Sequence, residues 1–290
     1  MFGKKERLTP EQKQAAAEDK RLEKIKLGKL KRNNRCALCL GGGGARGFAH
    51  IGAIKAFEEA GFDFDIVVGT SVGSIIGALY AYGVSSAAML QIGESLKEKE
   101  IHNGNLLFPN DAGRIGKIIT DLIGDVTIEQ INARRNKTFC AVAVDLVSAS
   151  EVVLSSGSAA FACSASSCVP VFFKPMVTED GKHLVDGGVL NNIPADVCRM
   201  LGAQSVITVD VNPTRGEGSD KLGSIGVLKT VFGMMSANSS QSGIINSDVI
   251  IAADTSEFSS GSKDGFMEMY ERGYSAAKQK LYEISQYLYK

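Results

Sequence analysis

The 290-residue chain lacks net charge, because 32 lysine and arginine residues balance 32 aspartate and glutamate residues. Bulk electrostatics therefore point to no polyanionic partner, and we expect no nucleic-acid contact. Proline is scarce, with six residues, and histidine is scarcer still, with three. An apolar content of 44% and a charged content of 22% exclude disorder throughout, collagen and coiled coil, and they suffice for a sizeable core.

Targeting and membrane-spanning segments are also missing. Residues 1–14 contain no apolar core for secretion, and their acidic residues argue against a transit peptide, so we expect a cytoplasmic protein. Two uncharged stretches, 66–93 and 152–173, are interrupted by glycine, serine or proline, and we predict that neither spans a membrane. Their lack of charge indicates burial beside a reaction centre.

The six cysteines form no disulfide framework or metal pattern. Cys36 and Cys39 make a CxxC, but they lie in an apolar run that is typical of a strand, where odd spacing directs their side chains to opposite faces. No second CxxC accompanies them. We predict buried thiols, no metal site and no cofactor.

The segment 1–35 differs from the rest of the chain in its charge. It carries 12 basic and 5 acidic residues, whereas residues 36–290 carry 20 and 27. Thr9, Pro10 and Gln12 supply an N-cap, a first-turn proline and a capping box, which predicts a helix running toward Leu27. We interpret 1–35 as a tail, either a solvated helix or a basic arm that contacts anionic membrane peripherally.

Short apolar runs alternate with helical stretches from residue 36 onward. The runs predict buried strands with little polar alternation, at 36–40, 66–68, 138–144 and 206–211. Helices are predicted between them at 50–60, 74–82 and 195–201, and an amphipathic helix over 266–288 closes the domain. The pattern favours an α/β class, a three-layer α/β/α fold with a mostly parallel central sheet, in one domain over 36–290.

Glycine, with 32 residues, is abundant and concentrates in motifs. GGGGARG at 41–47 follows a predicted strand and precedes a predicted helix, so its backbone N–H groups can converge on an anion. The same residues match a dinucleotide-binding GxGxxG. That site requires an acidic residue at the far end of the next strand, where Gly69, Thr70 and Ser71 stand instead.

A second motif, GTSVG at 69–73, lies between the predicted strand and helix. A serine on a sharp strand-to-helix turn has an exposed hydroxyl beside a helix N-terminus, and glycines on either side permit the turn. Ser71 is therefore a candidate nucleophile. A glycine-rich turn without chemistry is the alternative.

A third motif, DGG at 186–188, offers a base for that serine. His50, His102 and His183 all precede Asp186, so the usual order of serine, acid and histidine cannot be met. A carboxylate that accepts the serine proton directly remains, which makes Ser71 and Asp186 a candidate dyad. A simple turn is again the alternative.

Together GGGGARGFAHIGAIKAFEEAG, GTSVGSIIGALYA and DGGVLNNIP resemble the patatin-like phospholipase family, in particular its compact bacterial members. The resemblance implies a catalytic domain over 36–290 that cleaves carboxyl esters of phospholipids or lysophospholipids. It assigns Ser71 as nucleophile and Asp186 as base. It implies an oxyanion hole formed by Gly42, Gly43 and Gly44, in a loop that Arg46 supports.

Two other functions stay open at this stage, an acyltransferase that uses the same acyl-enzyme and a lipid-binding module without catalysis. The family often has arginine where this chain has Ser164, which bears on head-group contact and leaves the dyad unaffected. Residues 223–247 contain a single charge, Lys229. This composition predicts a buried helix, with a lid or a lipid-facing helix as the alternative.

Overall fold

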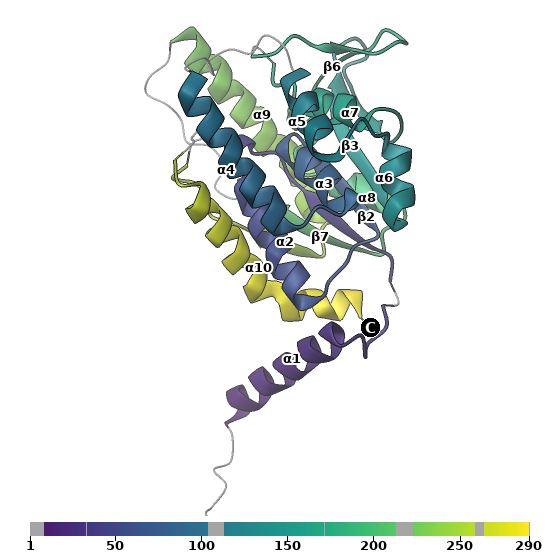
Figure 1. Cartoon of the computed structure of the whole chain (residues 1–290), viewed down its shortest axis with the longest axis vertical. Helices are drawn as coiled ribbons and strands as arrows, with labels where there is room; N and C mark the ends of the chain where they lie inside the picture. The colour runs from purple at the N-terminus through teal and green to yellow at the C-terminus, as the bar shows by residue number, and fades with distance from the viewer. Residues whose placement is uncertain are drawn as a thin grey trace, which may run out of the picture.

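A mixed sheet, covered on both faces by helices, forms the framework of the molecule (Figure 1). The structure is a computed structural model, and it describes residues 9–32, 34–103, 113–170, 172–212, 223–258 and 264–289. The sheet has eight strands in this part of the chain, in the order β5-β6-β3-β2-β1-β7-β8, with β4 paired to β3. The predicted α/β class and three-layer arrangement are confirmed.

Five strands run parallel through the middle of the sheet, and their bounds are β1 Cys36–Leu40, β2 Ile66–Thr70, β3 Thr138–Asp145, β7 Ser205–Asp210 and β8 Val249–Ala252. Three antiparallel strands extend one side, and they are β4 Ser150–Leu154, β5 Met176–Val177 and β6 His183–Asp186. Because β1 pairs with β2 on one side and β7 on the other, the chain reverses its direction of winding at β1. A crevice at the carboxyl ends of such strands is where open α/β sheets bind ligands.

Alternating strand residues divide the core into two layers. Leu38 packs among residues of helices α2, α3 and α10, whereas Cys39 packs against α8 on the opposite face. The helices of the first layer and its edges are α2 Phe48–Ala60, α3 Val72–Tyr82, α4 Ser86–Asn103, α5 Gly113–Ile123, α6 Ile128–Arg135, α7 Ala159–Ser166 and α10 Phe266–Leu288. The opposite layer contains α8 Ala195–Met200 and α9 Ser224–Asn246, and two short 3₁₀ helices are η1 Gly44–Gly47 and η2 Gly187–Val189.

All six cysteines are buried and free, as predicted. Cys36 and Cys39 belong to different core clusters, so the CxxC side chains do point to opposite faces. Burial raises the pKa of Cys36 to about 12, which keeps this thiol protonated. The described residues contain no group of three or more histidine, cysteine or acidic side chains arranged to hold a metal ion.

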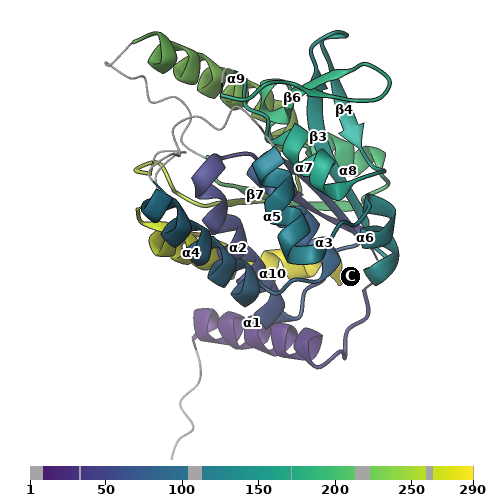
Figure 2. The same ribbon diagram turned by 45° about the horizontal axis from the view of Figure 1, so that its top comes forward.

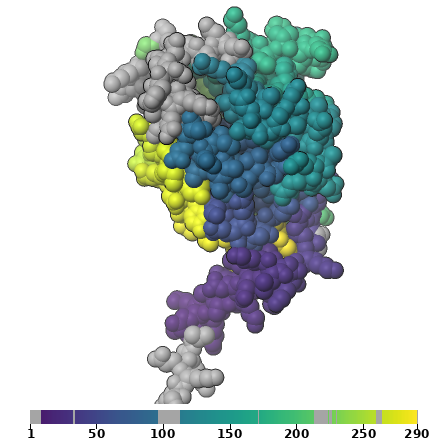
Figure 3. All heavy atoms as spheres, in the orientation of Figure 1, coloured from purple at the N-terminus to yellow at the C-terminus, as the bar shows by residue number. Residues whose placement is uncertain are grey.

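The predicted N-terminal helix is present as α1 Pro10–Lys26, with the capping box between Thr9 and Gln12. It is not wholly solvated. Ile25 is buried, and Arg21 donates hydrogen bonds to the Ser285 hydroxyl and carbonyl at the end of α10. A space-filling view shows α1 standing out from one end of the body (Figure 3).

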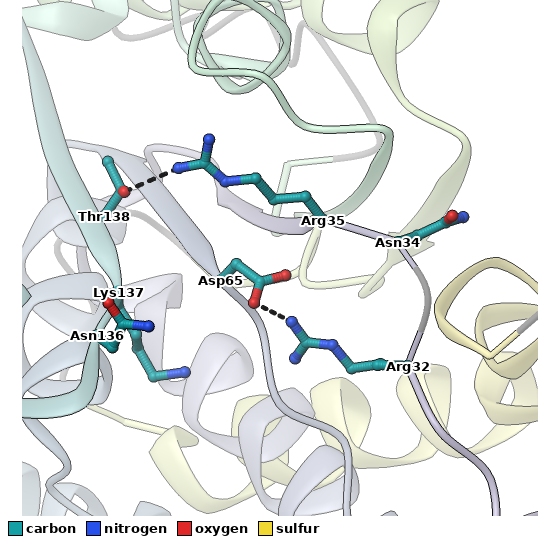
Figure 4. Close-up of a pocket in the computed structure, with 7 residues that line it drawn as sticks. All are labelled: Arg32, Asn34, Arg35, Asp65, Asn136, Lys137 and Thr138. Carbon is teal, nitrogen blue, oxygen red and sulfur yellow. Dashed lines mark hydrogen bonds and ion pairs between the residues drawn. The ribbon is translucent and has the colours of Figure 1, made fainter.

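Arginines after α1 attach this segment to the amino ends of the parallel strands. Arg32 forms an ion pair with Asp65 before β2, and Arg35 donates to the Thr138 hydroxyl at the start of β3 (Figure 4). Lys137 is buried beside them and donates to the Phe64 carbonyl. These side chains line a polar pocket at the edge of the sheet opposite to Ser71. Its cations are therefore engaged in holding the chain together.

Helix α9 corrects the expectation of a buried helix at 223–247. Its apolar side chains are largely solvent-exposed over the first half, and Met234, for instance, is 57% exposed. The side that packs on the domain carries small residues instead, among them Ser240 and Gly243, which are buried. No helix in the described residues is both long and apolar enough to cross a bilayer.

The substitution Gly273→Ala tests the crossing of α2 and α10. A Cβ at Gly273 would lie 1.9 Å from the Ala49 carbonyl oxygen, because the two helices touch through their backbones. Alanine favours a helix by about 1 kcal/mol over glycine, but overpacking costs about 1–3 kcal/mol. We expect the free energy of unfolding in urea to fall by up to about 2 kcal/mol, which is the overpacking cost less the helix gain. Ser275→Ala, at an exposed position of the same helix, should leave it unchanged or slightly raised; equal effects would contradict the close crossing.

Candidate active site

Ser71 lies on the turn between β2 and α3, at the carboxyl edge of the sheet. Its backbone has φ 54° and ψ −128°, a conformation that non-glycine residues rarely adopt. The chain consequently turns sharply, and Ser71 precedes the first turn of α3, where the helix dipole favours negative charge. The predicted strand-to-helix context of the serine is therefore confirmed, and strain is concentrated at this residue.

Glycines at 69 and 73 are required by close backbone contacts. A Cβ at Gly69 would lie 2.2 Å from the Gly73 carbonyl oxygen, and one at Gly73 would lie 2.1 Å from that of Leu40. These separations are far below van der Waals contact. The start of α3 thus packs directly on the backbone at the end of β1, which holds Ser71 next to the glycine loop.

Ser166 fixes the backbone of Ser71 from the other side. Its hydroxyl accepts a hydrogen bond from the Ser71 N–H at 2.9 Å and donates one to the Val142 carbonyl at 2.6 Å. The hydroxyl is buried at the end of α7 and links the strained turn to β3. Ser166 lies in a run of small residues with two other serines at 164–167, and no local pattern distinguishes its role from theirs.

Asp186 is buried at the end of β6, close to Ser71. Its Oδ1 accepts the N–H of Gly188 at 2.8 Å, and its Oδ2 has no partner with standard hydrogen-bond geometry among the described residues. Burial raises the pKa of Asp186 to about 7, although the Gly188 N–H and the Ser71 hydroxyl both lower it. A carboxylate with this pKa is half protonated near neutral pH, which suits a general base.

The antiparallel direction of β6 brings Asp186 to the serine. This strand pairs with β3, where Asp186 lies opposite Ala143, and the adjacent Val142 lies opposite Thr70 of β2. A Cβ at the following Gly187 would lie 3.0 Å from the Thr70 methyl group. Ser71 and Asp186, which are 115 positions apart in the sequence, therefore meet across three adjacent strands.

The histidines do not replace Asp186 in this arrangement. His50 is fully buried, and its Nε2 donates to the Gly41 carbonyl at 2.8 Å, while burial lowers its pKa to about 4. His183 is exposed at the start of β6, on the opposite side of the strand from Asp186. The side chain of His102 lies outside the described residues. His50 supports the glycine loop as a neutral donor.

The three glycines predicted to form an oxyanion hole differ in what their N–H groups contact. The N–H of Gly42 is donated to the Asn192 carbonyl at 3.1 Å, so Gly42 closes the loop against the segment after Asp186. The N–H groups of Gly43 and Gly44 have no acceptor among the described residues. Gly42 also lies close to the nucleophile, since its Cβ would be 3.3 Å from that of Ser71.

Arg46 and Asn212 hold the outer side of the loop. The Arg46 Nε donates to the Phe258 carbonyl at 2.7 Å, and its guanidinium also bonds the Asn212 side-chain oxygen. Asn212 in turn donates to the Gly42 carbonyl at 2.7 Å. Arg46 is thus connected to the loop through Asn212, in agreement with a supporting position.

Serines of α9 contact the segment after Asp186. The Ser239 hydroxyl donates to the Gly188 carbonyl at 3.0 Å and accepts the N–H of Asn192 at 3.2 Å. The Ser236 hydroxyl lies beside Gly188 and has no hydrogen-bond partner among the described residues. Sequence patterns did not indicate these contacts, because serines in a helix are common and their partners are about 50 residues away.

The site can support acyl transfer, because it combines a strained serine at a strand-to-helix turn with a buried carboxylate and a glycine loop with free N–H groups. This arrangement is typical of serine hydrolases. Comparison with known proteins defines the class further. The profile of the patatin-like phospholipase family matches residues 38–199. The chain belongs to this family, a class of carboxylic ester hydrolases.

Relatives share the family assignment. Patatin-like phospholipase domain-containing protein 6 of Mus musculus is 35% identical over 201 residues, which cover 67% of this chain and 15% of that protein. Neuropathy target esterase sws of Drosophila melanogaster is 34% identical over 61% of this chain and 13% of its own length. The chain therefore spans about one seventh of these relatives. VipD from Legionella pneumophila shares the fold, with a TM-score of 0.59 at 15% identity, over 88% of this chain and 68% of VipD.

Ser166→Ala tests how the strained turn is held. The change leaves the buried Ser71 N–H without its acceptor, which costs about 1–3 kcal/mol. We expect the free energy of unfolding to fall by that amount in urea. The adjacent Ser167 is an internal control, because its buried hydroxyl has no partner among the described residues, so Ser167→Ala should have little effect. Similar losses in both variants would contradict the assigned contact.

Proposed function

We propose that the chain is a serine acyl hydrolase that cleaves carboxyl esters of lipids, phospholipids or lysophospholipids, with Ser71 as nucleophile and Asp186 as base. The observation that carries the proposal is the juxtaposition of a strained serine and a buried carboxyl whose pKa is about 7. The family and the names of the relatives, phospholipase and esterase, support the class of substrate.

In the proposed reaction, the Ser71 Oγ attacks the ester carbonyl while Asp186 accepts its proton. The proton then passes to the departing alcohol, and water, deprotonated by Asp186, releases the acyl group from the enzyme. We assign the oxyanion donors to the N–H groups of Gly43 and Gly44, with Gly42 and Arg46 holding the loop in shape. Each such donor contributes about 3–4 kcal/mol to stabilising the transition state.

Residues 36–290 form the catalytic unit in this proposal, and residues 1–35 are a basic segment attached to it. The segment carries seven more basic than acidic residues, which suits contact with anionic lipid. Its helix α1 lies at the end of the molecule opposite β6 and α9 (Figure 1). Lipid bound there would be far from Ser71, so we assign this segment no part in presenting the substrate.

Ser71→Ala should abolish hydrolysis of p-nitrophenyl esters and of lysophospholipid, and also covalent labelling by a fluorophosphonate probe. The physical reason is that alanine leaves no oxygen nucleophile, while loop and base persist. Mass spectrometry of the labelled wild type should place the probe on the peptide that contains Ser71. Ser167→Ala, with a buried hydroxyl nearby in the fold, should retain both signals; labelling of Ser71→Ala would refute the assignment.

The pH dependence tests Asp186. A general base acts as the carboxylate, so kcat/KM for a soluble ester should rise about tenfold per pH unit below 7 and level off above it. Asp186→Asn should remove this activity. A profile that is flat between pH 5.5 and 8 would contradict the proposed base.

The raised pKa of Asp186 also predicts that the stability of Asp186→Asn relative to wild type depends on pH. Because the folded pKa of Asp186 is raised from 3.8 to about 7, the folded state gains stability from its protonated form at low pH and loses that gain as pH rises through 7. Asp186→Asn cannot ionise. Its Tm relative to wild type should therefore increase from pH 4 to pH 8, and a difference that stays constant would show that Asp186 ionises freely.

Activity measurements with an added acceptor distinguish acyl transfer from hydrolysis. An acyl-enzyme partitions between water and any bound alcohol, so adding lysophospholipid or a short alcohol reveals transferase activity as an esterified product. Hydrolysis that dominates at all acceptor concentrations supports the proposal. Lipid binding without turnover or probe labelling would refute it in favour of a binding module.

A further inference from the structure

Helix α9 places large apolar residues at exposed positions of its first half and small polar residues where its second half packs on the domain. Successive residues of an α-helix are separated by about 100° around its axis. On this spacing, Ser236, Ser240 and Gly243 share the side that packs on the domain, with Ser236 beside Gly188 and Ser240 beside Asn192. Over residues 227–235, the opposite side carries large apolar residues at a spacing of three and four, and these are Val227, Val231 and Met234, flanked by Leu228 and Met235.

Those apolar side chains are exposed. Val231 is 45% exposed and Met234 is 57% exposed, and the three others have comparable exposure. A water-soluble surface rarely carries such a stripe unless it contacts another apolar phase. The helix has one charged residue, Lys229, in its 23 positions, so little charge opposes contact with hydrocarbon. A helix whose exposed residues are apolar and whose other residues pack on the protein can lie in the plane of a lipid interface.

The inner side of α9 contacts the segment that follows Asp186. Ser239, on the inner side of α9, donates to the Gly188 carbonyl, two residues after Asp186. Leu190, which follows η2, is also exposed, as are Leu146 and Val147 after β3. All three follow elements that end at the carboxyl edge of the sheet, where Ser71 lies. We call Leu146, Val147, Leu190 and the exposed apolar residues of α9 between 227 and 235 the apolar rim.

Two views place α9 together with β6, at the end of the molecule opposite α1 (Figures 1 and 2). The basic charge of the chain is therefore concentrated away from the rim, and residues 36–290 carry seven more acidic than basic residues. An anionic membrane would repel this body. A neutral, zwitterionic lipid surface fits the rim by hydrophobic contact, which requires no charge complementarity.

We propose that the apolar rim is an interfacial docking surface for a zwitterionic phospholipid bilayer, with α9 lying in the membrane plane and the carboxyl edge of the sheet facing the lipid. A lipid leaving the bilayer would then pass along α9 to reach Ser71. This inference deepens the proposed function and rests on it for the identity of the substrate. The binding itself depends only on the surface.

Vesicle binding tests the surface without turnover. Full-length protein carrying Ser71→Ala is mixed with phosphatidylcholine vesicles in 0.1 M and 0.5 M NaCl, and bound protein is measured by flotation. We expect binding at both salt concentrations, because hydrophobic contact is not screened. Adding Val231→Asp with Met234→Asp should lower the partition coefficient about tenfold or more, since both charges would enter hydrocarbon.

Ile245→Asp is the matched control. Ile245 lies on the same helix and is 82% exposed, but it is ten positions beyond Met235, at the end of α9 that leads into β8 at the amino edge of the sheet, and so it lies outside the rim. This variant should bind within twofold of the parent. Val231→Leu with Met234→Leu should also retain binding, and unchanged circular dichroism of all variants establishes that they fold.

Three results would overturn the proposal. They are no binding to phosphatidylcholine by the parent, binding that requires anionic lipid and disappears in 0.5 M NaCl, and equal binding by the Asp double variant and Ile245→Asp. A dimer that the Asp double variant dissociates, with no vesicle binding by the parent, would assign the rim to a second copy of the chain instead.

Activity measurements separate this inference from the proposed function. With Ser71 present, the Asp double variant should lose hydrolysis of vesicle lipid at least ten times more than hydrolysis of dissolved p-nitrophenyl acetate. If the protein with Ser71 intact binds vesicles but hydrolyses neither substrate, the proposed function fails and the docking surface stands. If it hydrolyses the dissolved ester but does not bind vesicles, the docking surface fails alone.

Discussion

The direct backbone contact between the start of α3 and the end of β1 is the constraint on which the site depends. Gly73 leaves no space for a side chain against the Leu40 carbonyl, and Ser71 is held in its strained conformation two residues earlier. The same contact brings Gly42 against Ser71, so the nucleophile and the glycine loop share one fixed geometry. Ser166 completes the turn by taking the Ser71 N–H that the helix cannot use. Strain of about 1–3 kcal/mol at such a residue persists only where surrounding contacts over-determine it, and here they do so from β1, β2 and α7.

Burial of Asp186 lowers the stability of the folded protein, as does the backbone strain at Ser71. A carboxyl that is withdrawn from water and accepts one N–H, from Gly188, is harder to ionise, which is why its pKa lies near 7. The antiparallel strand β6 makes this burial possible, because it enters the sheet from the carboxyl edge and ends inside it. Stability and the proposed chemistry therefore oppose each other at this position, as they commonly do at active sites. The buried neutral His50 donates from Nε2 to the glycine loop, and burial lowers its pKa to about 4, which makes it a poor base.

The two ends of the molecule differ in their physical character. At the amino edge of the sheet, Arg32, Arg35 and Lys137 are engaged in ion pairs and hydrogen bonds that attach the N-terminal segment. At the carboxyl edge, the exposed residues in the first half of α9 are largely apolar, and the helix contains one charged residue. Charge alone would direct a membrane to the first end. The location of Ser71 and the exposed apolar area both favour the second, and hydrophobic contact at roughly 25 cal/mol per Å² does not depend on salt.

Much of this protein could be predicted from its sequence, because the relevant physics is local. Buried strands, the capping box of α1 and the turn at Ser71 follow from residue types at short spacing, and the glycine loop and Asp186 stand out as motifs. Pattern could not reveal that Gly42 donates to Asn192, that Ser166 holds the nucleophile or that α9 turns its serines inward. Each of these contacts joins residues between about 50 and 150 positions apart. For α9, a composition that is compatible with burial does not indicate which side of the helix packs on the domain. The sequence by itself determined the chemical groups of the site and the elements that carry them. Only the tertiary structure decided which N–H groups are free, which carboxyl is dehydrated and which apolar surface remains exposed, because these depend on segments distant in the sequence that pack against each group.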